Sequence, residues 1–252
     1  METMIRGPSP EFHGPRHLFR VSMMADCLAQ ALPPLSKRVL DAGSGNGSLV
    51  VALARRGYRV EGVDLSPACV AYSRGLIQRL GLAGRAAVRV GDVARLPYPD
   101  ESFDGLTSGE VLEHVPDDRR AVREFHRVLR PGGVCVVTVP LGKDLGPLDR
   151  WAGHRRRYDQ EGLRELFEEA GFRVELLRPW GFPFMALYQR LVHEPLLMRR
   201  ATRSEGDALL SLAPRLGQNP LLACLARALF RVDGLFAGLP WGVGLLLRVR
   251  KG

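Results

Sequence analysis

The chain has 252 residues, of which 46% are apolar, so one α/β domain or two small ones can bury a core. Residues 1–10 contain no apolar run, and we therefore expect no signal peptide. No apolar stretch reaches the roughly 18 residues that a membrane-spanning helix needs, which argues against a transmembrane protein.

The net charge of +9 comes almost entirely from arginine, because lysine occurs only at Lys37, Lys143 and Lys251. Such a bias is more typical of genome composition than of function. An anionic membrane surface, an anionic substrate or RNA would be the functional explanations.

The cysteines lie far apart and lack the spacing of metal ligands: Cys27, Cys69, Cys135 and Cys224. Most of them sit in apolar runs, which indicates buried free thiols and a reducing, cytoplasmic setting. His13 and His17 are four residues apart, but no third ligand accompanies them. We therefore expect no metal site.

Residues 1–37 precede the first predicted strand and form an N-terminal arm. Apolar residues at helical spacing predict a helix over 18–32, which Pro33 and Pro34 end. A polar and aromatic cluster at 11–17 stands ahead of this helix. We interpret it either as a solvated arm or as a flap that closes over a ligand.

Strands and helices alternate through the next part of the chain. We expect strands at 38–42, 59–64, 87–90, 103–107 and 134–139, and connecting helices at 46–56, 66–80 and 116–129. The short loops between them predict parallel strands and an α/β, doubly wound, Rossmann-like sheet. Ligands bind such sheets at the carboxyl ends of the strands, where the strand order reverses.

The second half is less regular. We expect a link at 141–157, a helix at 160–170, a strand at 172–177 and a last strand at 244–250. The core then comprises 38–181 with 244–252, and an insertion at 182–243 contains a largely apolar helix at 221–236. This insertion would be a lid, a dimer contact or a membrane-surface element, so the protein would be a monomer or a homodimer.

A glycine-rich turn follows the first predicted strand. Gly43, Gly45 and Gly47 permit positive φ angles and let a ligand approach the backbone. The next helix points its free N–H groups at the same place. Ser48 stands where a dinucleotide fingerprint requires its third glycine, so the turn is a general nucleotide cradle rather than a specific NAD motif.

Acidic residues follow the glycine turn at the ends of the next two strands. Asp64 closes the second strand and is placed to accept hydrogen bonds from ribose hydroxyls. Asp92 closes the third strand, where a carboxylate and a backbone N–H would suit the amine of adenine. The pattern predicts an adenosine-type ligand.

In order and spacing, four segments resemble the motifs of class I S-adenosylmethionine-dependent methyltransferases. They are VLDAGSGNG at 39–47, GVDLS at 62–66, GDVARLPYPDESFD at 91–104 and LRPGG at 129–133. The likeness is strongest to the small-molecule branch that includes the ubiquinone and menaquinone methyltransferases. It implies a seven-stranded sheet with an antiparallel last strand, S-adenosylmethionine as cofactor and S-adenosylhomocysteine as product.

The resemblance also implies a set of cofactor-binding residues: Asp41, Gly43, Ser44, Gly45, Asp64, Leu65, Asp92, Val93, Ser108, Gly109 and Glu110. The glycine turn would pass under the methionine part, and the last three residues would line the methionine end. Leu65 would flank the adenine that Asp92 and Val93 read. Asp41 would act on the turn, or on the ammonium group through water.

Methyl transfer from a sulfonium is an in-line displacement, so the protein mainly positions the reactants and excludes water. A carbon or hydroxyl acceptor also needs a base. His114 is the candidate, because it follows the fourth strand and imidazole titrates near neutrality. A structural role for His114 at the start of the next helix is the alternative.

A basic, aromatic loop follows the fifth predicted strand, on the rim where acceptors enter. His154, Arg156 and Tyr158 are its candidate acceptor contacts, since arginine suits an anion. The alternative is a solvated basic loop in which Tyr158 anchors the next helix.

The acceptor is expected to be small and hydrophobic, a quinone-, lipid- or secondary-metabolite-like molecule methylated on oxygen or carbon. Enzymes that methylate nucleic-acid amines often carry an Asn/Asp-Pro-Pro-aromatic segment after the fourth strand, and residues 107–110 contain neither proline nor an aromatic residue. The insertion at 182–243 favours delivery under a helical lid or from an anionic membrane surface. An NAD-dependent oxidoreductase and an RNA methyltransferase are the alternatives.

Overall fold

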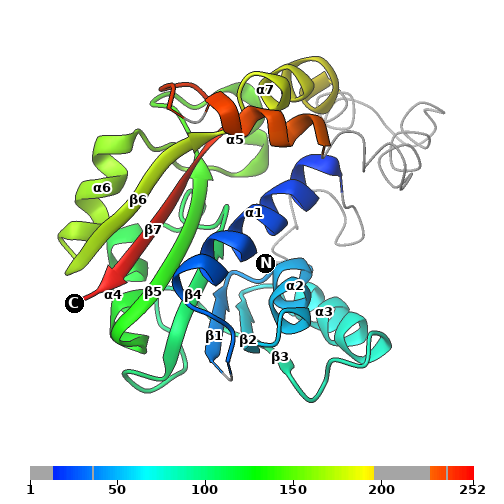
Figure 1. Ribbon diagram of the computed structural model, residues 1–252, viewed down its shortest axis with the longest axis vertical. Helices are drawn as coiled ribbons and strands as arrows, with labels where there is room; N and C mark the ends of the chain where they lie inside the picture. The colour runs from blue at the N-terminus through cyan, green and yellow to red at the C-terminus, as the bar shows by residue number, and fades with distance from the viewer. Residues whose placement is uncertain (1–13, 36, 196–227, 237) are drawn as a thin grey trace.

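The computed structural model describes residues 14–35, 37–195, 228–236 and 238–252. Within them, seven strands form one sheet in the order β3-β2-β1-β4-β5-β7-β6 (Figure 1). The strands are β1 (Arg38–Ala42), β2 (Arg59–Asp64), β3 (Ala86–Val90), β4 (Phe103–Gly109), β5 (Leu129–Pro140), β6 (Phe172–Trp180) and β7 (Gly244–Lys251). β1 to β5 are parallel, whereas β7 lies antiparallel between β5 and β6. The predicted fold class is confirmed.

The helices begin and end within a few residues of their predicted positions: α1 (Pro15–Ala31), α2 (Ser48–Arg55), α3 (Pro67–Arg79), α4 (Asp118–Val128) and α6 (Gln160–Glu168). The Ser66 side chain caps α3 by accepting a hydrogen bond from the Cys69 N–H. α2 begins later than expected, because Gly47 has a φ of 76° and cannot continue a right-handed helix. The predicted link at 141–157 contains a short helix, α5 (Pro147–Ala152), that the sequence did not indicate.

The sheet is buried on both faces, as successive residues of β5 show. Val134 and Val136 belong to the core that includes Met24 of α1, whereas Cys135 and Val137 pack into the opposite core. All four β5 side chains are fully buried. This two-sided burial explains why β5 is almost continuously apolar in sequence.

The N-terminal helix α1 lies against β4 and β5 and beside α2 (Figure 1). Gly105 of β4 permits this approach, because a Cβ there would lie 2.7 Å from Leu32 Cδ2. The described part of the arm is therefore a layer of the core rather than a solvated extension. Residues 11–13 of the 11–17 cluster lie outside the described residues, and the role of the cluster as a flap stays a prediction.

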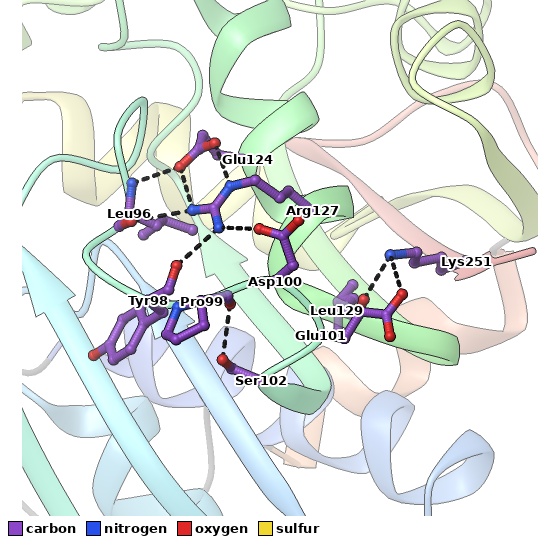
Figure 2. Close-up of polar contacts among 10 residues, drawn as sticks. All are labelled: Leu96, Tyr98, Pro99, Asp100, Glu101, Ser102, Glu124, Arg127, Leu129 and Lys251. Carbon is purple, nitrogen blue, oxygen red and sulfur yellow. Dashed lines mark hydrogen bonds and ion pairs between the residues drawn. The ribbon is translucent and has the colours of Figure 1, made fainter.

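One arginine of α4 holds the link between β3 and β4 (Figure 2). Arg127 donates hydrogen bonds to the carboxylates of Glu124 and Asp100 at 2.7 Å, and to the carbonyls of Tyr98 at 2.8 Å and Leu96 at 3.1 Å. Glu124 also accepts a hydrogen bond from the Leu96 N–H at 2.8 Å. These contacts hold the link where it leaves one rim of the ligand site.

Parts of the insertion at 182–243 are described. α7 (Phe184–Tyr188) continues into η1 (Gln189–His193), and residues 228–232 are helical before η2 (Asp233–Phe236). Asp233 is buried and accepts hydrogen bonds from the N–H groups of Phe184 and Met185, which joins the two parts. The predicted helix at 221–236 lies partly outside the described residues. Among the described helices, none is long and apolar enough to cross a bilayer.

Candidate active site

A cavity of about 590 Å³ opens at the carboxyl ends of β1, β2 and β4, where the strand order reverses. Every predicted cofactor residue lines it except Ser108. The Ser108 hydroxyl is buried and donates a hydrogen bond to the Ala42 carbonyl at 2.9 Å. Ser108 therefore does not line the cavity, contrary to the prediction that it lines the methionine end of the site. Because β4 extends to Gly109, Ser108 lies inside the sheet and joins β4 to β1.

The glycine turn forms one side of the cavity. Gly43 (φ +80°) packs so tightly that a Cβ would lie 2.3 Å from Val111 Cγ2. By contrast, no atom of the described residues lies within 4 Å of the Cβ position of Gly45 (φ +50°). Between them, the Ser44 hydroxyl is buried, and none of the described residues hydrogen-bonds to it. A tight turn with an open side and an unpaired hydroxyl suits a ligand that lies along the backbone.

The two acids at the strand ends are ordered by the backbone. Asp64 accepts a hydrogen bond from the Gly45 N–H at 2.8 Å, which ties the end of β2 to the glycine turn. Asp92 accepts one from the Ala94 N–H at 2.8 Å. Leu65 lies between these acids in the cavity wall and is 67% exposed, so it offers an apolar surface to an aromatic ring.

Asp41 lies beneath the glycine turn at the end of β1. Its carboxylate is buried and accepts a hydrogen bond from the Thr107 hydroxyl at 2.8 Å. Burial raises the pKa of Asp41 to about 7, although the Thr107 hydrogen bond opposes this change. At neutral pH the group can therefore exist in either charge state beside the ligand.

α1 supplies a wall that the sequence analysis missed. Arg20 and Met24 line the cavity, and both Arg16 and Arg20 bind Glu110, with N–O distances of 3.1 and 3.4 Å. Glu110 has a φ of 58°, which is uncommon for a residue other than glycine. The i, i+4 spacing of the two arginines was the only sequence signal, because the packing of α1 over β4 is what brings them to the site.

The turn at 110–116 lines another part of the cavity, and the link at 149–158 packs against this turn without lining the cavity itself. His114 lines the cavity as predicted, and the His154 ring packs edge-on against it, with 4.7 Å between ring centroids. The Arg155 N–H donates to the Glu113 carbonyl at 2.8 Å and joins the two segments. Burial, and then the nearby His154, lower the pKa of His114, so its imidazole is neutral at pH 7.

Arg156 and Tyr158 point into the protein rather than the cavity. Arg156 donates to the Pro116 carbonyl at 2.8 Å and pairs with Asp118. The Tyr158 hydroxyl donates to the same Asp118 carboxylate at 2.8 Å. These contacts fasten the link to the start of α4 and favour the structural alternative for both residues. Their role in acceptor binding stays a prediction.

A glycine turn after β1, acids after β2 and β3, and an antiparallel β7 together define a nucleotide-type site in a doubly wound fold. Residues 40–137 match a family model described as a methyltransferase domain. A "Probable S-adenosylmethionine-dependent methyltransferase" of Mycolicibacterium smegmatis is 39% identical over 143 residues, which cover 54% of this chain and 52% of the relative. A ubiquinone biosynthesis O-methyltransferase of Alkalilimnicola ehrlichii is 41% identical over 115 residues, which cover 45% of this chain and 46% of that protein.

A solved structure has the same fold. It is a 1,6-didemethyltoxoflavin-N1-methyltransferase of Burkholderia thailandensis with S-adenosylhomocysteine bound. The two structures match with a TM-score of 0.58 and 21% sequence identity. The match covers 92% of this chain and 78% of that chain. The match at 40–137 to a methyltransferase-domain model, and the likeness to relatives named as S-adenosylmethionine-dependent methyltransferases, confirm the resemblance. The chain spans about half the length of the curated relatives it matches.

Proposed function

We propose that this protein transfers the methyl group of S-adenosylmethionine to oxygen or carbon of a small, apolar acceptor. The observation that carries this proposal is the glycine turn. Gly45 leaves its backbone open to the cavity, the buried Ser44 hydroxyl lacks a partner among the described residues, and Asp64 stands beside both. The residues present therefore fit a ligand with a polar amino-acid part and a ribose.

Bound S-adenosylmethionine would supply a methyl group that is already activated by its sulfonium charge. The protein's part is to hold the two ends of the cofactor and to keep water away. Glu110 suits the ammonium group, since Arg16 and Arg20 contact its Oε2 while its buried Oε1 has no hydrogen-bond partner in the described part of the chain. Asp64 suits the ribose hydroxyls, because it keeps free lone pairs after binding the Gly45 N–H.

A hydroxyl or carbon acceptor must lose a proton as the methyl group is transferred. His114 lies on the cavity wall as a neutral imidazole, so it can accept a proton and pass it to water. A phenolate or carboxylate acceptor would need no such base.

Calorimetric titration tests the cofactor. We expect S-adenosylhomocysteine to bind in the micromolar range and NADH not to bind. A radiolabelled methyl group should then pass from S-adenosylmethionine to apolar phenols or hydroquinones and not to bulk RNA. Binding of NADH with no binding of S-adenosylhomocysteine would favour the oxidoreductase alternative, and labelled RNA would favour the RNA methyltransferase.

We also propose that the insertion contacts an anionic membrane surface. Large apolar side chains of its described parts are exposed: Leu191 at 63%, Leu235 at 83% and Trp241 at 57%. The basic Arg231 lies in the same part of the chain. Co-flotation with vesicles that contain anionic lipid, and not with neutral vesicles, is expected. A dimer in solution with no co-flotation would indicate a dimer contact instead.

A further inference from the structure

Three potential metal ligands meet behind the cavity wall. Glu113, His114 and His154 each offer one ligand atom, and these atoms lie within 4.8 Å of one another. A tetrahedral cation that binds each atom at about 2.0–2.2 Å holds them about 3.3–3.6 Å apart, so binding would draw the side chains together by up to about 1.5 Å. Glu113 and His114 are adjacent in sequence, whereas His154 arrives with the link at 149–158. The separation of the three residues along the sequence is therefore not one that indicates a metal site.

Glu113 is the least expected member of the group. Its side chain is fully buried, and among the described residues none hydrogen-bonds to either carboxylate oxygen. The nearest helical arginines, Arg16 and Arg20, pair with Glu110 instead. An unpartnered buried carboxylate is costly and rare in native proteins, so it calls for an explanation.

His154 is oriented as metal-bound histidines usually are. Its Nδ1 lies 2.8 Å from Asp149 Oδ1. Arg157 donates to both oxygens of Asp149, at 2.8 and 2.9 Å, and the Gly146 N–H donates to one of them at 2.8 Å. A carboxylate held as an anion in this way makes Nδ1 the protonated nitrogen. The Nε2 lone pair is then available to a cation.

His114 connects the cluster to the cavity. Its ring packs edge-on against the His154 ring, with 4.7 Å between ring centroids. The same ring lines the cavity in which we propose that methyl transfer takes place. Two imidazoles and one carboxylate form a ligand set that suits zinc and its first-row neighbours.

We propose that Glu113, His114 and His154 bind a divalent cation of the zinc type. Asp149 is a positioning residue that acts through His154. Three protein ligands leave at least one coordination position for an oxygen of water or of an acceptor. This proposal differs from our expectation, based on the sequence, that the chain has no metal site.

The catalytic consequence rests on the proposed methyl transfer. An acceptor hydroxyl bound at this position would release its proton to water, because coordination lowers its pKa. Its oxygen would then form a bond to the methyl carbon while the carbon–sulfur bond breaks and leaves its electron pair on sulfur. In this arrangement His114 is a ligand and not a base.

Cobalt and zinc binding to the full-length, untagged protein tests the site. We expect one equivalent of Co²⁺ with visible absorption bands of a four- or five-coordinate site, displaced by Zn²⁺. His154→Ala and Glu113→Gln should weaken binding at least 100-fold, and Asp149→Asn about 10- to 100-fold. His126→Ala is the matched control, because His126 packs against Phe172 outside the cluster, and it should bind as the parent does.

Two further measurements separate misfolding from loss of the site. Glu113→Leu removes an unpaired buried carboxylate, so it should raise the unfolding temperature of the metal-free protein while it abolishes Co²⁺ binding. Each variant should keep the parent's affinity for S-adenosylhomocysteine. Absence of Co²⁺ bands in the parent, or equal binding by His154→Ala, would overturn the metal site and leave the methyl-transfer proposal standing. Failure of the parent protein to bind S-adenosylhomocysteine would contradict only the methyl-transfer proposal.

Discussion

The two walls of the cavity are built in different ways. The cofactor wall is a continuous turn at 43–47, with Gly45 bound to an acid that ends the next strand. The part of the cavity where we propose that the acceptor binds, here called the acceptor wall, rests on two segments, 110–118 and 149–158. They are joined through Arg156, Tyr158 and the backbone of Arg155. The cofactor wall depends on backbone conformations, whereas the acceptor wall depends on side-chain hydrogen bonds and an ion pair between two segments. Substitutions should therefore affect the two walls differently.

The largest effect is expected in the glycine turn. Gly43→Ala would place a Cβ 2.3 Å from Val111 Cγ2 at a φ of +80°, so we expect a loss of about 3 kcal/mol in stability and at least 100-fold in S-adenosylhomocysteine affinity. Gly81→Ala is the control, because Gly81 also has a positive φ (+68°) but none of the residues that the structure describes lies within 4 Å of its Cβ position. It should lose about 1 kcal/mol and bind normally. Equal effects on affinity would show that backbone strain alone, without crowding, governs binding.

Asp41 should make stability depend on pH. Its folded-state pKa of about 7 exceeds the ordinary aspartate pKa of 3.8, so between these pH values the folded protein holds a proton that the unfolded chain has lost. Stability should fall as the pH rises from about 4 to 7, by up to about 1.4 kcal/mol per unit of pKa change. Asp41→Asn should flatten this slope in urea melts of the ligand-free protein. If the slope of stability against pH were unchanged in Asp41→Asn, other titratable groups would cause the pH dependence.

Asp64→Asn should weaken the cofactor wall without unfolding it. Asparagine has one acceptor oxygen, so it cannot accept from both the Gly45 and Ser66 N–H groups as Asp64 does. Losing one charge-assisted hydrogen bond costs about 1.5–3 kcal/mol, so S-adenosylhomocysteine should bind about 10- to 100-fold more weakly in calorimetry. Asp92→Asn is expected to have a smaller effect, since Asp92 holds only the nearby Ala94 N–H. A larger loss of affinity in Asp92→Asn than in Asp64→Asn would indicate that the ribose lies nearer Asp92.

The smallest effect tests the acceptor wall. Arg156→Ala removes the contacts to Pro116 and Asp118, so the unfolding temperature should fall by about 2–4 °C with unchanged cofactor affinity. Arg155→Ala is the control, because Arg155 is exposed and its backbone N–H, which binds Glu113, remains. A higher acceptor KM with no change in melting would instead support the predicted role of Arg156 in binding an anion.

Local sequence was sufficient for the strands and for the cofactor wall. The order of strands, helices and short loops determined a doubly wound sheet, because parallel strands need crossovers and the crossovers have one hand. Positive φ at Gly43 and Gly45, and the cap at Ser66, follow from the chemistry of single residues. For this reason the residues that the motifs indicated line the cavity, with Ser108 as the exception, while their binding of a cofactor stays a prediction.

Tertiary structure alone decided what faces the cofactor. The packing of α1 over Gly105 brings Arg16 and Arg20 to Glu110, and the contacts of Asp118 bring the 149–158 link beside His114. These pairings join residues far apart in the chain, and a sequence pattern records only near neighbours. The sequence thus determined the glycine turn and the acidic strand ends that line the cavity, while long-range packing and side-chain pairing determined which other groups lie beside them.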